Sequence, residues 1–158
     1  MCLITKQKRA KRIEQDLIVY KVLISSIRNN EIRYYGLLMS NFEYKLNVLY
    51  KTKLKRNVKT IEKRNSNRWD SLVGKAYPSW IINPDVITIS QGFHSFKSIN
   101  RYFNNDLELK KQRIMENGFA KCVIPKGSLV YEDVTGLIVS DQIKLLKIMK
   151  EEEVLKLI

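Results

Sequence analysis

The sequence predicts an α+β domain with a twisted, mainly antiparallel sheet and two or three helices. Its 158 residues, 44% hydrophobic and 28% charged, are enough for one ordinary globular domain, so we treat residues 1–158 as a single domain. Residues 42–50 alternate between apolar and polar types, which is typical of a half-buried antiparallel strand. Two later stretches, 97–103 and 107–116, have helical patterns, with Asp106 placed to cap the second one.

The first half of the chain predicts three strands. Asp16 to Ile24 is rich in β-branched residues on both faces, which suits the interior of a sheet, and Lys21 interrupts its apolar run. Ile32 to Met39 is the second strand, in which Gly36 marks a bulge or a close backbone approach. The third is the alternating stretch 42–50, which we expect to be continuous.

The second half adds shorter strands. Val86 to Ser90 and Phe119 to Ile124 are strand candidates, and Ile124 to Gly127 matches a type I turn. Residues 129–131 and 137–139 flank a loop that contains glycine, as in a hairpin. Residues 143–149 fit either a strand or part of a final helix, and we favour a strand followed by a short helix.

Positive charge is concentrated in the first 68 residues, where 17 Lys and Arg face 5 Asp and Glu; the other 90 residues hold 12 and 11. Two segments carry most of this excess, a basic N-terminal arm at 1–15 and a basic loop at 51–68. A localised field of this kind indicates a polyanionic or acidic partner. The alternative is a solvated basic face without a dedicated ligand.

The basic residues begin on the polar face of the alternating strand. Its parity continues through Lys51, Lys53 and Lys55, which would form a ladder with Lys45 at intervals of roughly 7 Å. Lysine exceeds arginine here, which favours contacts to a phosphate backbone over the reading of bases. Tyr50 and Trp69 stand at the two ends as stacking platforms. The predicted binding residues are Lys45, Lys51, Lys53, Lys55, Arg56, Lys59, Lys63, Arg64, Arg68 and Trp69.

A second candidate site is a pocket formed by Tyr20, Lys21, His94 and Ser95. His94, the one histidine, could exchange protons near neutral pH or serve only as a hydrogen-bonded structural residue. Lys21 could be a buried ammonium directed at an anion, or could extend its head to water near a strand end.

Metal and cofactor motifs are missing from the sequence. One histidine and two distant cysteines do not supply a zinc site, and six scattered glycines form neither a P-loop nor a dinucleotide fingerprint. We therefore expect no cofactor and no catalytic residues. No segment approaches the length of a membrane span, which predicts a cytoplasmic protein of a host cell or a virion-associated one.

Four motifs, taken together, resemble a family of small proteins of phages and gut anaerobes that has no assigned activity. They are residues 16–23 (DLIVYKVL), 42–46 (FEYKL), 92–96 (GFHSF) and 122–128 (CVIPKGS). This resemblance implies a phage or mobile-element protein.

A looser similarity runs to ADP-ribosyltransferase-like folds, which bind nicotinamide dinucleotide. It places Tyr20-Lys21, residues 92–96 and Asp141-Gln142 around the cleft. Lys21 stands where that family has Arg or His, and no Glu occupies the late position. The similarity implies a degenerate domain whose cleft survives as a nucleotide-binding pocket.

We therefore expect a small, non-enzymatic binding protein of the phage or mobile-element type. Its basic surface would engage a polyanionic partner, either nucleic acid or an acidic protein surface. The alternatives are the degenerate ADP-ribosyltransferase-like domain and a virion or host-factor interaction protein.

Overall fold

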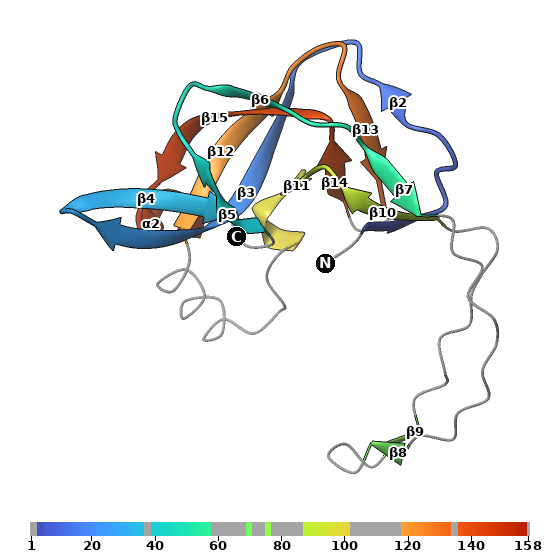
Figure 1. Ribbon diagram of the computed structural model, residues 1–158, viewed down its shortest axis with the longest axis horizontal. Helices are drawn as coiled ribbons and strands as arrows, with labels where there is room; N and C mark the ends of the chain where they lie inside the picture. Colours follow the sequence, from blue (N-terminus) through green and yellow to red (C-terminus); the bar gives the residue numbers. More distant parts are fainter. Residues whose placement is uncertain are drawn as a thin grey trace.

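The computed structural model describes residues 3–36, 39–57, 69–70, 75–76, 87–101, 118–133 and 136–157. Most of them belong to one ten-stranded antiparallel sheet with the strand order β2-β13-β14-β11-β3-β12-β15-β6, in which β4 pairs with β3 and β5 pairs with β4 (Figure 1). The strands are β2 (Lys11–Arg12), β3 (Leu17–Arg28), β4 (Glu31–Gly36), β5 (Met39–Tyr44), β6 (Leu49–Lys51), β11 (Phe93–Phe96), β12 (Gly118–Ile124), β13 (Leu129–Glu132), β14 (Leu137–Ser140) and β15 (Gln142–Met149).

The large sheet curls around its main core. Strands from both halves of the sheet, including β13 and β15, contribute buried side chains to one cluster. The sheet bends at Asp141, the single residue between β14 and β15. Its backbone N–H donates to Leu129 O at 3.1 Å, its carboxylate accepts from Leu129 N at 2.9 Å, and its carbonyl accepts from Thr52 N at 2.8 Å. Asp141 therefore ties three segments together at the bend.

A three-stranded sheet, β1-β10-β7, forms a second layer. Its strands are β1 (Leu3–Thr5), β10 (Ile87–Gln91) and β7 (Lys55–Asn57). Leu3 and Ile89 from this sheet share a buried cluster with Tyr131, Leu137 and Val139 of the large sheet. Strand β14 is therefore covered on both faces, which explains why every one of its residues is buried.

The chain passes from one sheet to the other at Gly92, between β10 and β11. Its φ of +147° is a conformation that residues with a side chain rarely adopt, and an added Cβ would overlap Val139 and Leu54. Glycine therefore allows the two sheets to approach each other at this point.

Among the described residues, those that pack on the outer face of the large sheet gather at one end. Val154 of helix α2 (Glu151–Leu155) and Ile99 of the 3-10 turn η1 (Ile99–Arg101) pack there against Val22 and Phe119. Further along, the same face of β3, β12 and β15 carries exposed residues such as Lys121.

Beyond the covered region, β3 and β4 extend as a hairpin away from the curled sheet (Figure 1). Asn29 and Asn30 have φ values of 52° and 62°, as a two-residue turn between twisted strands requires. Ile27 and Ile32 lie directly opposite each other near the tip and are 73% and 60% exposed. Two further short strands, β8 (Trp69–Asp70) and β9 (Lys75–Ala76), pair with each other.

The predicted α+β class with two or three helices is wrong, because the fold is mainly β. The described part of the predicted helix at 97–103 holds only the 3-10 turn, and 107–116 lies outside the described residues. Short strands that no local pattern predicts, such as β1 and β2, complete the sheets. Their pairing with β10 and β13 is long-range, so no local pattern announces it.

The predicted continuous strand at 42–50 is also wrong. It stops after Tyr44, and a loop precedes β6. Asn47 adopts a φ of 61°, its N–H donates to Leu145 O at 2.8 Å, and Tyr50 Oη accepts from Lys45 N at 2.6 Å. The bond to Leu145 and the bond between Lys45 and Tyr50 within the stretch stabilise the loop and outweigh the local alternation.

Other local predictions compare well with the structure. The strand at Asp16 to Ile24 is confirmed and is longer than expected. The predicted strand at Ile32 to Met39 is wrong at its end, because β4 stops at Gly36 and Met39 begins β5, which pairs antiparallel with β4; the register of this pair is irregular between Tyr35 and Gly36. The hairpin of β13 and β14 and the final strand and short helix are confirmed as well. The turn after β12 begins one residue later than predicted, since Ser128 N donates to Pro125 O at 3.1 Å and Gly127 takes a φ of 85°.

Candidate basic surface and the buried lysine

The predicted basic ladder is divided between two sheets. Lys51 ends β6 in the large sheet, and Lys55 begins β7 in the small one. Lys51, Lys53 and Lys55 are all exposed and alternate with residues that point inward: Tyr50 packs on the main core and Leu54 on the second cluster. Lys45 is exposed but lies on the far side of the loop at Asn47.

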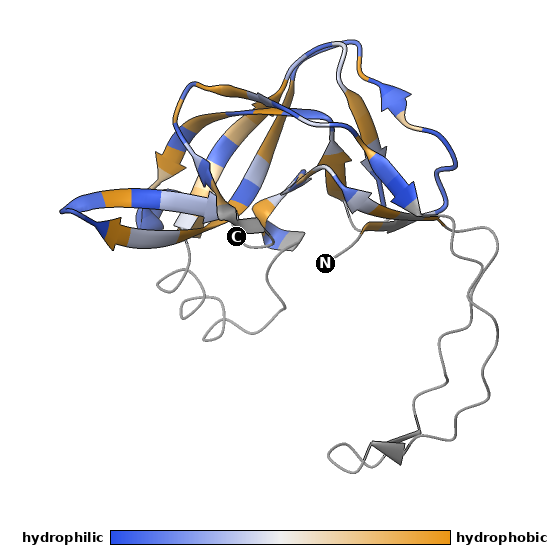
Figure 2. Cartoon of the chain, viewed as in Figure 1, coloured by the Kyte–Doolittle hydropathy of each residue, from blue (hydrophilic) through white to orange (hydrophobic). Residues whose placement is uncertain are grey.

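The two basic segments of the sequence meet in space. Strand β1 and strand β7 pair with opposite edges of β10, which brings the N-terminal segment next to residues 55–57. Arg56 Nη1 donates to Lys8 O at 3.0 Å across 48 positions of sequence. Lys8, Lys53, Lys55 and Arg56 are exposed, and we call these four residues the basic end. Figure 2 shows β7 and β2 as hydrophilic elements on this side of the molecule.

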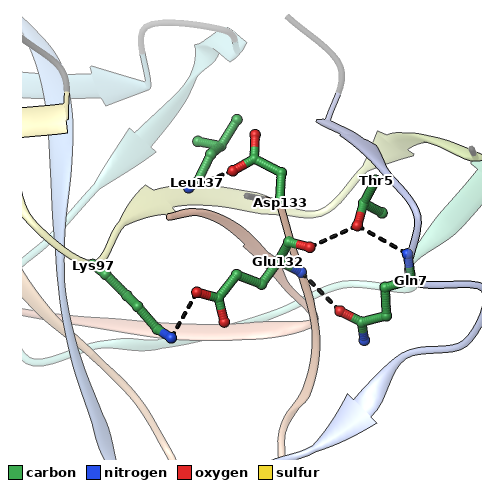
Figure 3. A network of polar contacts seen from close by, with 6 residues as sticks. All are labelled: Thr5, Gln7, Lys97, Glu132, Asp133 and Leu137. Carbon is green, nitrogen blue, oxygen red and sulfur yellow. Dashed lines mark hydrogen bonds and ion pairs between the residues drawn. The ribbon is translucent and has the colours of Figure 1, made fainter. Parts of the chain in front are cut away.

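Hydrogen bonds hold the N-terminal segment in place. Thr5 Oγ1 donates to Glu132 O at 2.6 Å and accepts from Gln7 N at 3.1 Å, while Glu132 N donates to Gln7 Oε1 at 3.0 Å (Figure 3). The predicted basic arm at 1–15 is thus attached to the sheets from Leu3 onward, through β1 and β2. Lys8 is presented on a fixed backbone.

The described carboxylates near the basic end pair with other groups. The nearby Glu132 is engaged with Lys97, whose Nζ lies 2.6 Å from Glu132 Oε1 (Figure 3). Among the described residues, no carboxylate lies within ion-pair distance of Lys8, Lys53, Lys55 or Arg56. Within the described part of the chain, their positive charge is therefore unpaired.

A shallow depression of about 540 Å³ lies beside β2. Arg12 and Lys126 line it, together with Ile13, Glu14, Gln15 and Gly127. Arg12 Nη1 donates to Gly127 O at 2.6 Å, and Lys126 N donates to Asp16 Oδ1 at 2.8 Å. Because acidic groups share this region, its charge is mixed, in contrast to the basic end.

Several predicted binding residues fall where the structure gives no side-chain position. Lys59, Lys63, Arg64 and Arg68 lie outside the described residues. The backbone of Trp69 is described in β8, without its side chain.

The residues of the predicted pocket divide between opposite faces of the sheet. Lys21 and Ser95 point into the main core, since their neighbours Val19 and Phe93 on the same strand faces belong to that cluster. Tyr20 lies on the outer face of β3. The His94 side chain lies on the face of β11 that carries Val139, its cross-strand partner.

Lys21 is 7% exposed and does not reach water. Its Nζ donates to the backbone carbonyl of His94 at 2.8 Å and lies 5.1 Å from the centroid of the Tyr44 ring. Burial lowers the pKa of Lys21 to about 8, because removal from water disfavours the charged form. Tyr44 belongs to a cluster of four rings with Phe42, Tyr50 and Phe93, whose centroids are 4.8 to 6.5 Å apart.

The side chains of His94 and Ser95 lie on opposite faces of β11. Burial, and then the charge of Lys21, lower the pKa of His94 to about 4, so the imidazole is neutral at pH 7. Ser95 is fully buried, and its hydroxyl has no hydrogen-bond partner among the residues described. Asp141, assigned to the cleft by the ADP-ribosyltransferase similarity, is the bend residue described above. That similarity and its nucleotide pocket stay predictions.

Two lysines that sequence reasoning missed lie near the basic ladder. Lys121 of β12 and Lys144 of β15 share the outer face of the large sheet with Lys51. Lys121 is the one charged residue in an apolar strand, a signal of an outward position. Its proximity to Lys144 depends on strand pairing that the sequence does not reveal.

No family model, curated protein or solved structure matches this chain. In the part of the chain that is described, no helix has the length and hydrophobicity to cross a membrane. The same residues hold no cluster of three or more His, Cys, Asp or Glu side chains able to share a metal ion. Any functional argument therefore depends on the chain's own surface.

Proposed function

We propose that the protein binds nucleic acid at the basic end, through the phosphate backbone and without reading sequence. The observation that carries this proposal is the contact between Arg56 and Lys8, which joins the two basic segments into one exposed surface. Such a function agrees with the phage or mobile-element setting that the sequence resemblance implies.

The composition of the basic end supports backbone contacts. Three of its four cations are lysines, which act as point charges toward phosphate and do not fork onto a base. Each phosphate neutralised on a single strand contributes about −0.7 to the slope of the logarithm of the association constant against the logarithm of the salt concentration. Four contacts therefore predict a slope of about −3 or steeper.

Fluorescence anisotropy with a labelled oligo-dT tests the proposal over a range of salt concentrations. The double variant Lys53→Gln/Lys55→Gln should bind more weakly and show a slope smaller by about 1.4, because two phosphate contacts are lost. A matched control, Arg28→Gln/Lys156→Gln, removes two exposed cations from the hairpin tip and the end of α2.

The control variant should behave like the wild-type protein. Equal losses in both variants would show that net charge alone governs binding, and the basic end would then have no special role. Binding of an acidic polypeptide such as poly-Glu in preference to oligo-dT would assign the surface to an acidic protein partner and overturn the nucleic-acid proposal.

A further inference from the structure

Three lysines form a diagonal line across the outer face of the large sheet. Lys144 of β15 pairs in register with Val123 of β12 and with Leu49 of β6. Lys121 and Lys51 lie two residues from these partners and therefore on the same face as Lys144. Diagonal neighbours of this kind are about 7 Å apart.

This face brings positive charges close together. Lys121 and Lys147 are direct cross-strand partners, an arrangement that destabilises a sheet when the charges are alike. Lys147 is compensated by Glu153, whose Oε1 lies 2.5 Å from its Nζ. Lys121, Lys144 and Lys51 have no carboxylate within ion-pair distance in the described parts of the chain. An external anion bound between these lysines would reduce the repulsion among them.

The line continues into the basic end without a gap. Lys51 is followed by Lys53 and Lys55, which are also exposed and can lie at most about 7 Å apart along residues 51–55. From Lys121 to Lys55 the path through the five lysines is thus at most about 30 Å long. Arg56 and Lys8 extend the series at the small sheet. Exposed apolar side chains border the line, with Ile18 and Leu49 42% and 43% exposed.

The series follows a bent path. It crosses three strands of the large sheet and then runs along residues 51–55 to the small sheet, which is a separate layer (Figure 1). A flexible single strand can follow such a path and place successive phosphates near successive lysines. A straight, stiff duplex contacts only one section of it.

We infer that the ligand of this surface is single-stranded nucleic acid, bound along a track formed by Lys121, Lys144, Lys51, Lys53, Lys55, Arg56 and Lys8. This inference rests on the proposed function and specifies its substrate class. The bordering Ile18 and Leu49 side chains have no hydrogen-bond donor or acceptor for a base edge, so binding is independent of sequence.

The test compares dT4, dT12 and a 12-base-pair duplex by fluorescence anisotropy. The variant Lys121→Gln/Lys144→Gln, which leaves the basic end intact, is measured beside the wild-type protein and the Arg28→Gln/Lys156→Gln control. For dT12, the track variant should lose affinity and show a salt slope smaller by about 1.4. The affinity of the track variant for dT4 should change no more than that of the control, because the basic end alone can hold dT4. The same should be true of its affinity for the duplex.

Two results would overturn the track. The first is that the track variant loses no more affinity for dT12 than the control does. The second is that the duplex binds as tightly as dT12 and that its affinity falls equally when Lys121 and Lys144 are replaced. In both cases binding at the basic end would stand. Absence of binding by the wild-type protein to all three probes would instead overturn the proposed function itself. Circular dichroism melting confirms that each variant is folded.

Discussion

The buried Lys21 should make stability depend on pH in a way that the variant Lys21→Met removes. In the folded protein the pKa of Lys21 is about 8, against an ordinary value of 10.5. Between these values the unfolded chain holds the proton and the folded chain has released it. The free energy of unfolding therefore rises with pH through this window. The contribution of Lys21 to it is complete above pH of about 10.5 and is lost as the pH falls to about 8.

The magnitude follows from the two pKa values. Their difference, 10.5 − 8, is about 2.5, and each pKa unit corresponds to about 1.4 kcal/mol, which gives about 3 kcal/mol. Burial also raises the pKa of Cys122 to about 12, which lowers stability above pH 9. This opposing effect is present in both proteins and largely cancels when they are compared.

Urea denaturation followed by circular dichroism measures the difference at pH 7, 8, 9 and 10, with a reductant present. Relative to Lys21→Met, the wild-type protein should gain about 2 to 3 kcal/mol across this range. A difference that stays constant with pH would show that the Lys21 ammonium reaches water, and the structural account of the core would be refuted.

Three further perturbations test the fold. Gly92→Ala should destabilise by more than about 2 kcal/mol in thermal melts, because the added Cβ overlaps Val139 and Leu54 at a positive φ; a neutral result would contradict the close packing of the two sheets. Asp141→Ala should cost about 1 to 3 kcal/mol by losing the acceptor for Leu129 N, whereas Asp141→Asn keeps an acceptor and should cost less; equal costs would argue against this bond. Wild-type stability should fall as pH drops from 6.5 to 4, since the folded pKa of His94 is about 4, and His94→Gln should weaken this dependence; an unchanged acid limb in denaturation curves would contradict it.

Local patterns in the sequence predicted the elements whose partners are close in sequence or whose composition is strongly apolar. The central strand β3, the β13–β14 hairpin and the final strand with its short helix are of this kind. The α+β class with two or three helices is wrong because the helical pattern near residue 100 gives only a single 3-10 turn in the described region. The turn at Asn29-Asn30 is also readable locally, because asparagine tolerates the positive φ that a two-residue hairpin turn requires.

The candidate site was only partly readable. Alternation placed Lys51, Lys53 and Lys55 on one side of the chain, and burial of Tyr50 and Leu54 explains why. The meeting of Lys8 with Arg56 depends on β10 lying between two distant strands. Likewise, Lys121 approaches Lys144 only through the pairing of β12 with β15, which includes a register shift after Lys121. Such long-range pairings leave no periodic trace in a single sequence.

The central claim is that lysine and arginine side chains at the basic end and along the adjoining track hold a single strand by its phosphates. The dissociation constant of dT12, measured from 50 to 200 mM salt, tests it most directly. Seven cations, each contributing about −0.7, predict that the logarithm of the association constant falls with the logarithm of the salt concentration with a slope of about −5. A slope near zero, or no binding at 50 mM salt, would contradict the account.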